Sequence, residues 1–352
     1  MTKTYNAIGL MSGTSLDGLD IAYIEFSENH GHWNFEIKCC ETIKYDFHWK
    51  NTLKNAPSLS AEKLRKLDVE YGHFLGISTA EFLKKNKIRP KLVASHGHTI
   101  FHNPAEAYTL QIGDGAAIVS HLNVPVIFDF RSQDVANGGQ GAPLVPIGDQ
   151  FLFGDFDACL NIGGFANISI LISDQRLAWD VCPANIVLNE LAQSLGFDYD
   201  DEGKLASEGS CDERLLRKLR GLEYYSKNPP KSLGREWVEE NVLPLIKKYS
   251  ISYQDLITTF TIHIAEEIAR TLSNIKGKVL VSGGGAKNKF LINEIIKRTQ
   301  AEIIIPNENI IDYKEALIFA FMGVLRSENK INILNSVTGA KKSISAGSIV
   351  MP

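Results

Sequence analysis

Glycine, hydroxyl and carboxylate residues are concentrated in one segment, Gly9–Asp20, which reads GLMSGTSLDGLD. Its glycines allow backbone N–H groups to approach an anion without a Cβ in the way. Asp17 and Asp20 are suited to hold Mg²⁺ through water. The segment lacks the lysine of a Walker A loop, and a strand follows it, which excludes that motif and a dinucleotide fingerprint. We predict a phosphate-binding hairpin, with a plain hairpin turn as the alternative, formed by Gly13, Thr14, Ser15, Leu16, Asp17, Gly18, Leu19 and Asp20.

Two later glycine loops are candidates for further phosphate or nucleotide contacts. The loop 161–167 lies between two predicted strands, where two glycines allow close backbone approach and an asparagine can hydrogen-bond a phosphate oxygen. The loop 281–288 runs from a buried strand into a helix, which suits close approach by a nucleotide. A bulge or a tight turn would explain either loop without a ligand. The candidate residues are Gly163, Gly164, Asn167, Gly283, Gly284 and Gly285.

A candidate general base stands in the segment Ala178–Asn185, which reads AWDVCPAN. Asp180 ends a predicted strand just before Pro183, a favourable first residue for the helix that follows. An aspartate in this place commonly caps the helix. At the carboxyl end of a strand it is also placed to deprotonate water or a hydroxyl group. Both roles of Asp180 remain open from the sequence.

Three histidines follow another predicted strand, in the segment 95–102, which reads SHGHTIFH. Together with Asp129 or Asp134 they could form a zinc site. A polar loop in which His96 hydrogen-bonds a sugar or an amide explains the residues without a metal. Arg131 follows the next strand and is suited either to clamp a substrate carboxylate or to form an internal ion pair.

Periodicity indicates that an α/β fold positions these loops. Apolar alternation predicts strands, and helical spacing of apolar residues predicts amphipathic helices. The predicted strands are 5–10, 19–26, 33–40, 91–95, 124–128, 157–163, 166–172, 177–179, 278–282 and 302–305. The predicted helices are 61–87, 113–122, 183–196, 233–248, 253–274, 287–298 and 312–326.

The pattern of elements restarts in the middle of the chain, because each half opens with strands joined by a glycine-rich turn and then alternates helix and strand. A Gly- and Pro-rich stretch, 137–146, marks the boundary. We therefore predict two domains with similar sheets, 1–145 and 146–352, and a ligand in the cleft between them. This division leaves the last helix able to pack back on the first domain.

Composition excludes several partners. The 37 Lys and Arg residues against 41 Asp and Glu give a formal net charge of −4, which offers no surface for nucleic acid or anionic membranes. The longest apolar stretch, 316–325, is shorter than the ~20 residues of a membrane helix. The five cysteines are scattered without a C-x-x-C pair, which predicts reduced thiols and a cytoplasmic protein.

The motifs resemble those of the anhydro-N-acetylmuramic acid kinase family, within the sugar kinase/actin/Hsp70 superfamily. The strings MSGTSLDG and GGQGAP carry the resemblance most specifically, and the matching segments span nearly the whole chain. The resemblance implies two actin-like, ribonuclease H-like domains with an interdomain cleft. One departure follows Asp180: the family usually reads TGPGN there, whereas this chain reads VCPAN over 181–185.

The resemblance also implies an activity. Such enzymes use ATP and Mg²⁺, open 1,6-anhydro-N-acetylmuramic acid with water and phosphorylate O6 in peptidoglycan recycling. Asp180 would be the general base, the glycine loops would hold the nucleotide, and Asp17 would hold Mg²⁺ through water. The sugar and ATP are the expected partners, and a homodimer is one possible assembly. The alternatives are a nucleotide-binding sensor or assembly protein of the superfamily, and a kinase of a related anhydro sugar. The residues implied on the sugar side are His96, Arg131, Asp134 and Glu315.

Overall fold

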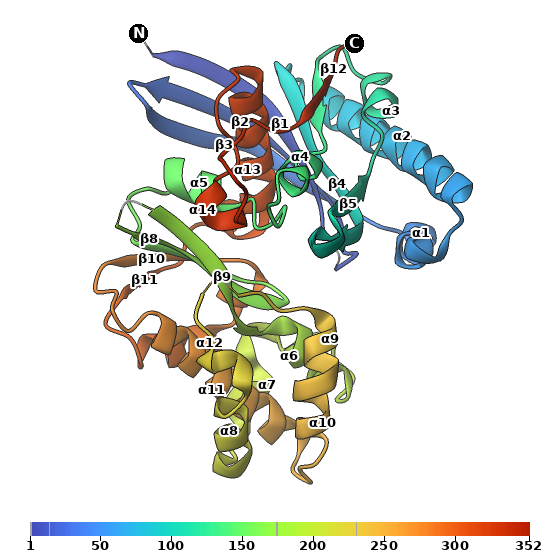
Figure 1. Ribbon diagram of the computed structural model, residues 1–352. Coiled ribbons are helices and arrows are strands. Elements are labelled where there is room, and N and C mark those ends of the chain that lie inside the picture. Colours follow the sequence, from blue (N-terminus) through green and yellow to red (C-terminus); the bar gives the residue numbers. More distant parts are fainter. Residues whose placement is uncertain (1, 14, 174, 230) are drawn as a thin grey trace. The chain divides into compact units, whose positions relative to one another are not determined.

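The computed structural model describes residues 2–13, 15–173, 175–229 and 231–352 (Figure 1). The chain divides into two compact units. Unit 1 comprises residues 1–153 and 313–352, and unit 2 comprises residues 154–312. Each unit contains one large mixed sheet, so the predicted α/β class with two sheets is confirmed.

The sheet of unit 1 has the strand order β12-β6-β4-β1-β2-β3, with β5 paired to β4. Strands β1, β2 and β3 form an antiparallel meander, whereas β4 runs parallel to β1 and β6 runs parallel to β4. The strands are β1 (Lys3–Ser12), β2 (Gly18–Asn29), β3 (His32–Lys44), β4 (Leu92–Asn103), β5 (Tyr108–Ile112), β6 (Val126–Phe128) and β12 (Ser348–Val350).

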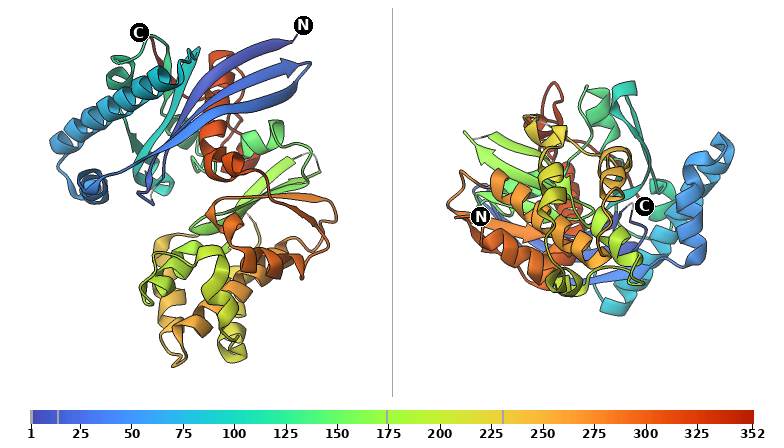
Figure 2. Two further views of the ribbon diagram at one scale, coloured as in Figure 1. Left: turned by 180° about the vertical axis from the view of Figure 1, so that it is seen from behind. Right: turned by 90° about the horizontal axis from the view of Figure 1, so that it is seen from below.

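Helices cover both faces of this sheet (Figures 1 and 2). Successive side chains of a strand point to opposite faces. Ile8 and Leu10 of β1 pack in the core beside Tyr71 of α2 (Ala61–Asn86). Gly9 faces α13 (Glu308–Ser327), where an added Cβ would lie 1.8 Å from the Ala316 carbonyl oxygen. The glycine therefore lets β1 and α13 pack backbone to backbone.

The remaining helices of unit 1 are short and lie between strands or near the C-terminus. They are α1 (Phe47–Asn55), η1 (Ala56–Ser58), η2 (Pro104–Glu106), α3 (Gly115–Val119), α4 (Ser132–Ala136), α5 (Pro146–Phe151) and α14 (Asn335–Thr338).

The sheet of unit 2 has the order β11-β10-β7-β8-β9. Strands β7, β8 and β9 form an antiparallel meander like that of unit 1, and β10 and β11 extend the sheet as parallel strands. The strands are β7 (Ala158–Ile162), β8 (Phe165–Ile172), β9 (Gln175–Pro183), β10 (Lys278–Ser282) and β11 (Glu302–Ile304).

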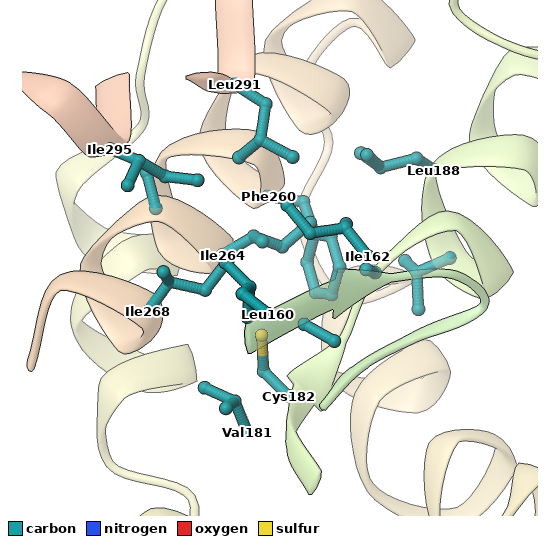
Figure 3. Close-up of a cluster of buried hydrophobic side chains, with 14 of the residues drawn as sticks. Leu160, Ile162, Val181, Cys182, Leu188, Phe260, Ile264, Ile268, Leu291 and Ile295 are labelled. Carbon is teal, nitrogen blue, oxygen red and sulfur yellow. The ribbon is translucent and has the colours of Figure 1, made fainter. Parts of the chain in front are cut away.

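One face of the unit 2 sheet packs against α11 (Tyr253–Thr271). Leu160 and Ile162 of β7 meet Phe260, Ile264 and Ile268 of this helix in a continuous apolar core (Figure 3). The other helices of unit 2 are α6 (Asn185–Gln193), η3 (Asp201–Gly203), α7 (Lys204–Glu208), α8 (Glu213–Arg220), η4 (Glu223–Ser226), α9 (Arg235–Trp237), the π-helical η5 (Val238–Val242), α10 (Leu243–Ile246), η6 (Gly284–Lys287) and α12 (Lys289–Ile296).

The two sheets share one topology. Each sheet contains an antiparallel three-stranded meander that two parallel strands extend, in the order β3-β2-β1-β4-β6 in unit 1 and β9-β8-β7-β10-β11 in unit 2. This is the ribonuclease H-like arrangement, repeated as in actin-like proteins. The restart of the pattern in the sequence corresponds to this duplication.

The unit boundary differs from the predicted division at 145/146. Residues 137–146 are held within unit 1, because Gln140 N–H donates to the Thr338 carbonyl (2.8 Å) and Lys341 N–H donates to the Asn137 carbonyl (3.3 Å). Helix α5 also belongs to unit 1, and the chain passes between units at 153/154 and 312/313. The second passage falls inside α13. The predicted cleft between the domains stays a prediction.

Among the described residues, no helix combines the length and apolarity needed to cross a membrane.

Candidate functional site

The first predicted phosphate hairpin joins β1 to β2. Ser15 and Asp17 are exposed at its tip, and Thr14 lies outside the described residues. A Cβ on Gly13 would meet its nearest neighbour, the Ser15 hydroxyl, at 3.5 Å, which is an ordinary van der Waals contact. A Cβ on Gly18 would lie 2.5 Å from the Ile43 carbonyl oxygen. Packing against β3 therefore requires Gly18, whereas packing does not require Gly13.

The two carboxylates of this hairpin have different surroundings. Asp20 accepts a hydrogen bond from the Thr42 hydroxyl at 2.6 Å, whereas Asp17 is exposed. Leu19 is fully buried in the unit 1 core. A single exposed carboxylate fits a magnesium ion held mainly by nucleotide phosphates and water, which is the usual coordination of Mg²⁺ with ATP.

Arg131, at the start of α4, forms a fixed pair with His96 of β4. Its Nε and one terminal nitrogen lie 3.0 and 2.8 Å from His96 Nε2, and its other terminal nitrogen donates to the Gly141 carbonyl. Because His96 Nε2 accepts, its Nδ1 carries the hydrogen and donates to the Gly97 carbonyl at 2.9 Å. Burial, reinforced by the charge of Arg131, holds the pKa of His96 well below its usual range. His96 is therefore neutral.

Glu315 of α13 is the electrostatic partner of this pair. Burial lowers the pKa of Arg131 to about 10, and the charges of Glu315 and Asp134 oppose that shift. Burial likewise raises the pKa of Glu315, and Arg131 opposes the change. The structure thus brings together three of the predicted sugar-side residues: His96, Arg131 and Glu315.

Asp134 is the fourth predicted sugar-side residue, and its carboxylate forms hydrogen bonds with other residues of unit 1. It is fully buried, accepts from Gly141 N–H at 2.8 Å and accepts from the Thr338 hydroxyl at 2.9 Å. A Cβ on Gly139 would lie 2.2 Å from its Oδ2. Asp134 therefore holds the loop whose Gly141 carbonyl receives Arg131. This contact makes Asp134 a positioning residue for Arg131.

The zinc hypothesis is wrong for the described residues, in which no three His, Cys, Asp or Glu side chains form a possible metal site. The histidines lie within β4 and not in a loop after it. Gly97 has a φ of +74° and breaks the strand alternation. His96 therefore contacts Phe319 of α13, whereas His98 contacts Tyr71 of α2 on the opposite face.

The second glycine hairpin joins β7 to β8 in unit 2. Cβ atoms on Gly163 and Gly164 would make only ordinary contacts, at 3.6 Å or more. The carbonyl groups of these glycines accept hydrogen bonds from Ala184, Asn185 and Ile186 at the start of α6. The hairpin and the beginning of α6 therefore fix one another. Asn167 lies on β8 opposite Asp180 of β9.

Asp180 is held by backbone hydrogen bonds from a loop that precedes α9. Its Oδ2 accepts from Leu233 N–H at 2.8 Å, and its own N–H donates to the Lys231 carbonyl at 3.1 Å. The Tyr224 hydroxyl donates to the Asp180 carbonyl at 2.7 Å. The Asp180 carboxylate makes no capping bond to α6, whose N-cap is Ala184. The capping alternative for Asp180 is therefore wrong.

The electrostatics of Asp180 suit a base. Its side chain is half-buried, and burial raises its pKa above the usual range, while the hydrogen bond from Leu233 lowers it and limits the shift. A carboxylate with a raised pKa accepts a proton more readily than a solvated one does. One of its oxygens has no described hydrogen-bond partner in the protein.

The third glycine loop follows β10 and lies beside the second hairpin. A Cβ on Gly285 would lie 2.2 Å from Ile162, and Gly283, with a φ of +81°, would place one 2.5 Å from Asn161 Oδ1. A Cβ on Gly284 would make only an ordinary contact, at 3.8 Å from Asn185 Nδ2. Packing therefore requires the outer two glycines and does not require the middle one.

Sequence reasoning missed the residues that support these loops. Tyr224 and Lys231 form hydrogen bonds with the backbone of Asp180, and Tyr45 forms hydrogen bonds with the first hairpin. A lone tyrosine in a predicted loop gives no signal of such a role.

The repeated sheet order and the glycine hairpin on the first strand pair of each unit define the class: this is a protein of the actin-like superfamily, which includes sugar kinases. Among solved structures, a ligand-bound xylulose kinase from Lactobacillus acidophilus gives a TM-score of 0.44 at 11% identity, covering 99% of this chain and 94% of that chain.

The sequence comparisons define the family. The family model for anhydro-N-acetylmuramic acid kinase matches residues 5–352. A relative from Francisella tularensis subsp. novicida with that name is 33% identical, covering 99% of each chain. One from Coxiella burnetii is 34% identical, covering 97% of this chain and 96% of its own length. The chain belongs to the anhydro-N-acetylmuramic acid kinase family.

Proposed function

We propose that this protein is an ATP-dependent kinase that opens 1,6-anhydro-N-acetylmuramic acid with water and phosphorylates O6. The observation that carries the proposal is the environment of Asp180. Its half-buried carboxylate accepts a backbone hydrogen bond, and it lies on the strand that pairs with the second glycine hairpin. A protein that only senses nucleotide needs no such base. Membership of the kinase family supports the same reaction.

In the proposed reaction a water oxygen bonds to the anomeric carbon while the bond from that carbon to O6 breaks. O6 accepts the γ-phosphoryl group of ATP, so that ADP leaves. Asp180 accepts the proton that the water loses. The products are N-acetylmuramic acid 6-phosphate and ADP, and every atom of ATP, water and sugar is accounted for.

The glycine hairpins supply the nucleotide contacts in this proposal. Packing does not require a glycine at Gly13, Gly163, Gly164 or Gly284, and we assign the backbone N–H groups near them to phosphate oxygens. Asp17 would hold Mg²⁺ through water, and the ion would neutralise phosphate charge when bound. Arg131, His96 and Glu315 would face the sugar, with Asp134 holding Arg131 in place.

The sequence VCPAN after Asp180 departs from the usual family sequence, but it does not change the substrate that we propose, 1,6-anhydro-N-acetylmuramic acid. Val181 and Cys182 are buried in the unit 2 core and point toward Ile264 and Ile268 (Figure 3). Ala184 is also fully buried. The three positions that differ from the usual family sequence are therefore core positions of this chain. The carboxylate and its backbone donors are retained.

We also propose a cytoplasmic location, since the scattered free cysteines suit a reducing compartment. The sugar and ATP are the proposed partners. A homodimer remains a prediction that light scattering of the purified protein would check.

Replacement of Asp180 by Asn tests the function directly. Asp180→Asn keeps the shape and still accepts from Leu233 N–H, but it cannot take the proton. We expect kcat to fall by ~10²–10⁴, the usual contribution of a general base, with ATP affinity and melting temperature nearly unchanged. In the wild type, kcat/KM should fall at acidic pH as Asp180 becomes protonated, at a higher pH than for a solvated aspartate.

Asp200→Asn is the matched control. Asp200 is also a buried aspartate of unit 2 with a raised pKa, and it accepts backbone hydrogen bonds from Leu205 and Ala206. It lies outside the proposed site, so its replacement should affect stability only. Wild-type turnover by Asp180→Asn would exclude the proposed base.

A further inference from the structure

Tyr45, between β3 and α1, contacts both ends of the first glycine loop. Its hydroxyl donates to Ser12 Oγ at 2.7 Å, and Ser12 is the last residue before the loop. Its backbone N–H donates to the Asp17 carbonyl at 3.3 Å, at the end of the loop. One residue thus bridges the entry and the exit of residues 13–17.

The Tyr45 phenol is itself held from behind. Its oxygen lies 2.6 Å from the Tyr71 hydroxyl, and its ring packs against Phe74 with centroids 6.0 Å apart. Tyr45 is 4% exposed and Tyr71 is fully buried. A buried phenol with two packed neighbours has one available position, so the hydroxyl that reaches Ser12 is preorganised.

His98 is the third member of this hydrogen-bond network. Ser12 Oγ lies 2.8 Å from His98 Nδ1 and accepts a hydrogen bond from Tyr45. A serine hydroxyl has one hydrogen and two lone pairs, so it can donate to Nδ1 or accept from it. In the first arrangement the hydrogen of the neutral imidazole lies on Nε2. Burial lowers the pKa of His98 to about 4, in agreement with a neutral ring.

We propose that Tyr45 is the positioning residue of the nucleotide loop: with Ser12 and His98 it forms a clamp that holds the two ends of the loop, Ser12 and Asp17, in the arrangement that receives the phosphates of ATP. This inference rests on the proposed function for its ligand, because the clamp serves a nucleotide only if the loop binds one. The clamp itself stands on the hydrogen bonds within unit 1.

The test uses Tyr45→Phe, which removes one hydroxyl and keeps the ring packing. Tyr225→Phe is the matched control, because Tyr225 is a buried tyrosine of unit 2 whose hydroxyl lies 2.9 Å from His263 Nε2. Each variant loses one buried hydroxyl, which in Tyr45 contacts Ser12 and Tyr71 and in Tyr225 contacts His263. Ser12→Ala is the second variant, which removes the other side of the clamp.

Two readouts separate the clamp from the proposed function. Amide hydrogen exchange of peptides covering residues 12–20, measured without ligand, should accelerate in Tyr45→Phe and Ser12→Ala and stay unchanged in Tyr225→Phe. Calorimetric titration with ATP should show affinity lowered about three- to tenfold in the first two variants only, the size of one hydrogen bond.

Each result decides a different claim. Unchanged exchange of residues 12–20 in both Tyr45→Phe and Ser12→Ala would overturn the clamp, and so would an equal loss of ATP affinity in Tyr225→Phe. A wild-type protein that binds no ATP would overturn the proposed function, and the exchange data would still decide whether Tyr45 holds the loop. An Nε2–H signal assigned to His98 in ¹⁵N spectra at neutral pH would support the arrangement in which Ser12 donates to Nδ1.

Discussion

At the scale of single residues, glycines that look alike in the sequence have two different roles. Gly18, Gly283 and Gly285 are required because a Cβ would strike a neighbouring atom at 2.5 Å or less. Gly13 has no such neighbour, although it belongs to the same motif as Gly18. Packing therefore explains Gly18, Gly283 and Gly285 but not Gly13, for which we propose a phosphate contact.

The first prediction concerns Gly13. Gly13→Val places a branched side chain where phosphates are proposed to lie, and in the free protein its Cβ would make only an ordinary contact, at 3.5 Å from the Ser15 hydroxyl. We expect ATP binding to be abolished in a calorimetric titration while the fold is retained. Gly221→Val is the control, because a Cβ there would also lie 3.5 Å from its nearest neighbour and Gly221 is remote in the chain from the loops. Unchanged ATP affinity in Gly13→Val would refute the phosphate role.

At the scale of elements, α11 carries a charged group into the core of unit 2. Glu267 is 3% exposed and forms an ion pair with Arg270 of the same helix. Burial raises the pKa of Glu267 to about 7, and Arg270 opposes this shift. The ionised form is therefore less favourable in the folded protein than in the unfolded chain.

The stability of the protein should depend on pH through this residue. Between the unfolded pKa near 4.5 and the folded value of about 7, the folded protein binds the extra proton. Stability therefore decreases as pH rises through this interval, by roughly 1–3 kcal/mol. Thermal melts of wild type and Glu267→Gln should show the wild type losing melting temperature relative to the variant from pH 5 to pH 8. A difference that stays constant or grows in the opposite direction would contradict the raised pKa.

Elements were more predictable from the sequence than the contacts between them. The predicted helix 61–87 corresponds to α2, and the first three predicted strands correspond to β1, β2 and β3. These elements are long, so their amphipathic or alternating pattern of apolar residues is clear in the sequence. Strand β4 was predicted to end at 95 and extends to Asn103. Polar histidines and the bulge at Gly97 interrupt the apolar alternation that would predict the rest of this strand. The same bulge directs His96 and His98 to opposite faces of the sheet.

The candidate site was predictable to the same extent. Glycine loops and Asp180 stand out by residue type and spacing. The hydrogen bonds from Leu233 to Asp180 and from Tyr45 to Ser12 join residues far apart in the chain, so no local pattern reports them. The internal use of Asp134 is hidden for the same reason, since its partner Thr338 lies near the C-terminus.

At the scale of the whole molecule, one sheet topology occurs twice and its two copies carry different chemistry. Unit 1 provides a glycine hairpin with the His96–Arg131 pair, and unit 2 provides a glycine hairpin with Asp180. Because the candidate residues are divided between the units, we predict that neither unit alone is sufficient for the proposed reaction. The central claim is that the intact chain couples hydrolytic ring opening to phosphoryl transfer.

Mass spectrometry of the products formed in H₂¹⁸O tests this claim most directly. With ATP and 1,6-anhydro-N-acetylmuramic acid, rapidly quenched reactions should yield a sugar phosphate that carries one ¹⁸O atom on the anomeric carbon and none in its phosphate, with unlabelled ADP. The product incubated alone in H₂¹⁸O corrects for slow anomeric exchange. An unlabelled sugar phosphate with its anhydro ring intact, or ¹⁸O found in released inorganic phosphate without any sugar phosphate, would contradict the account.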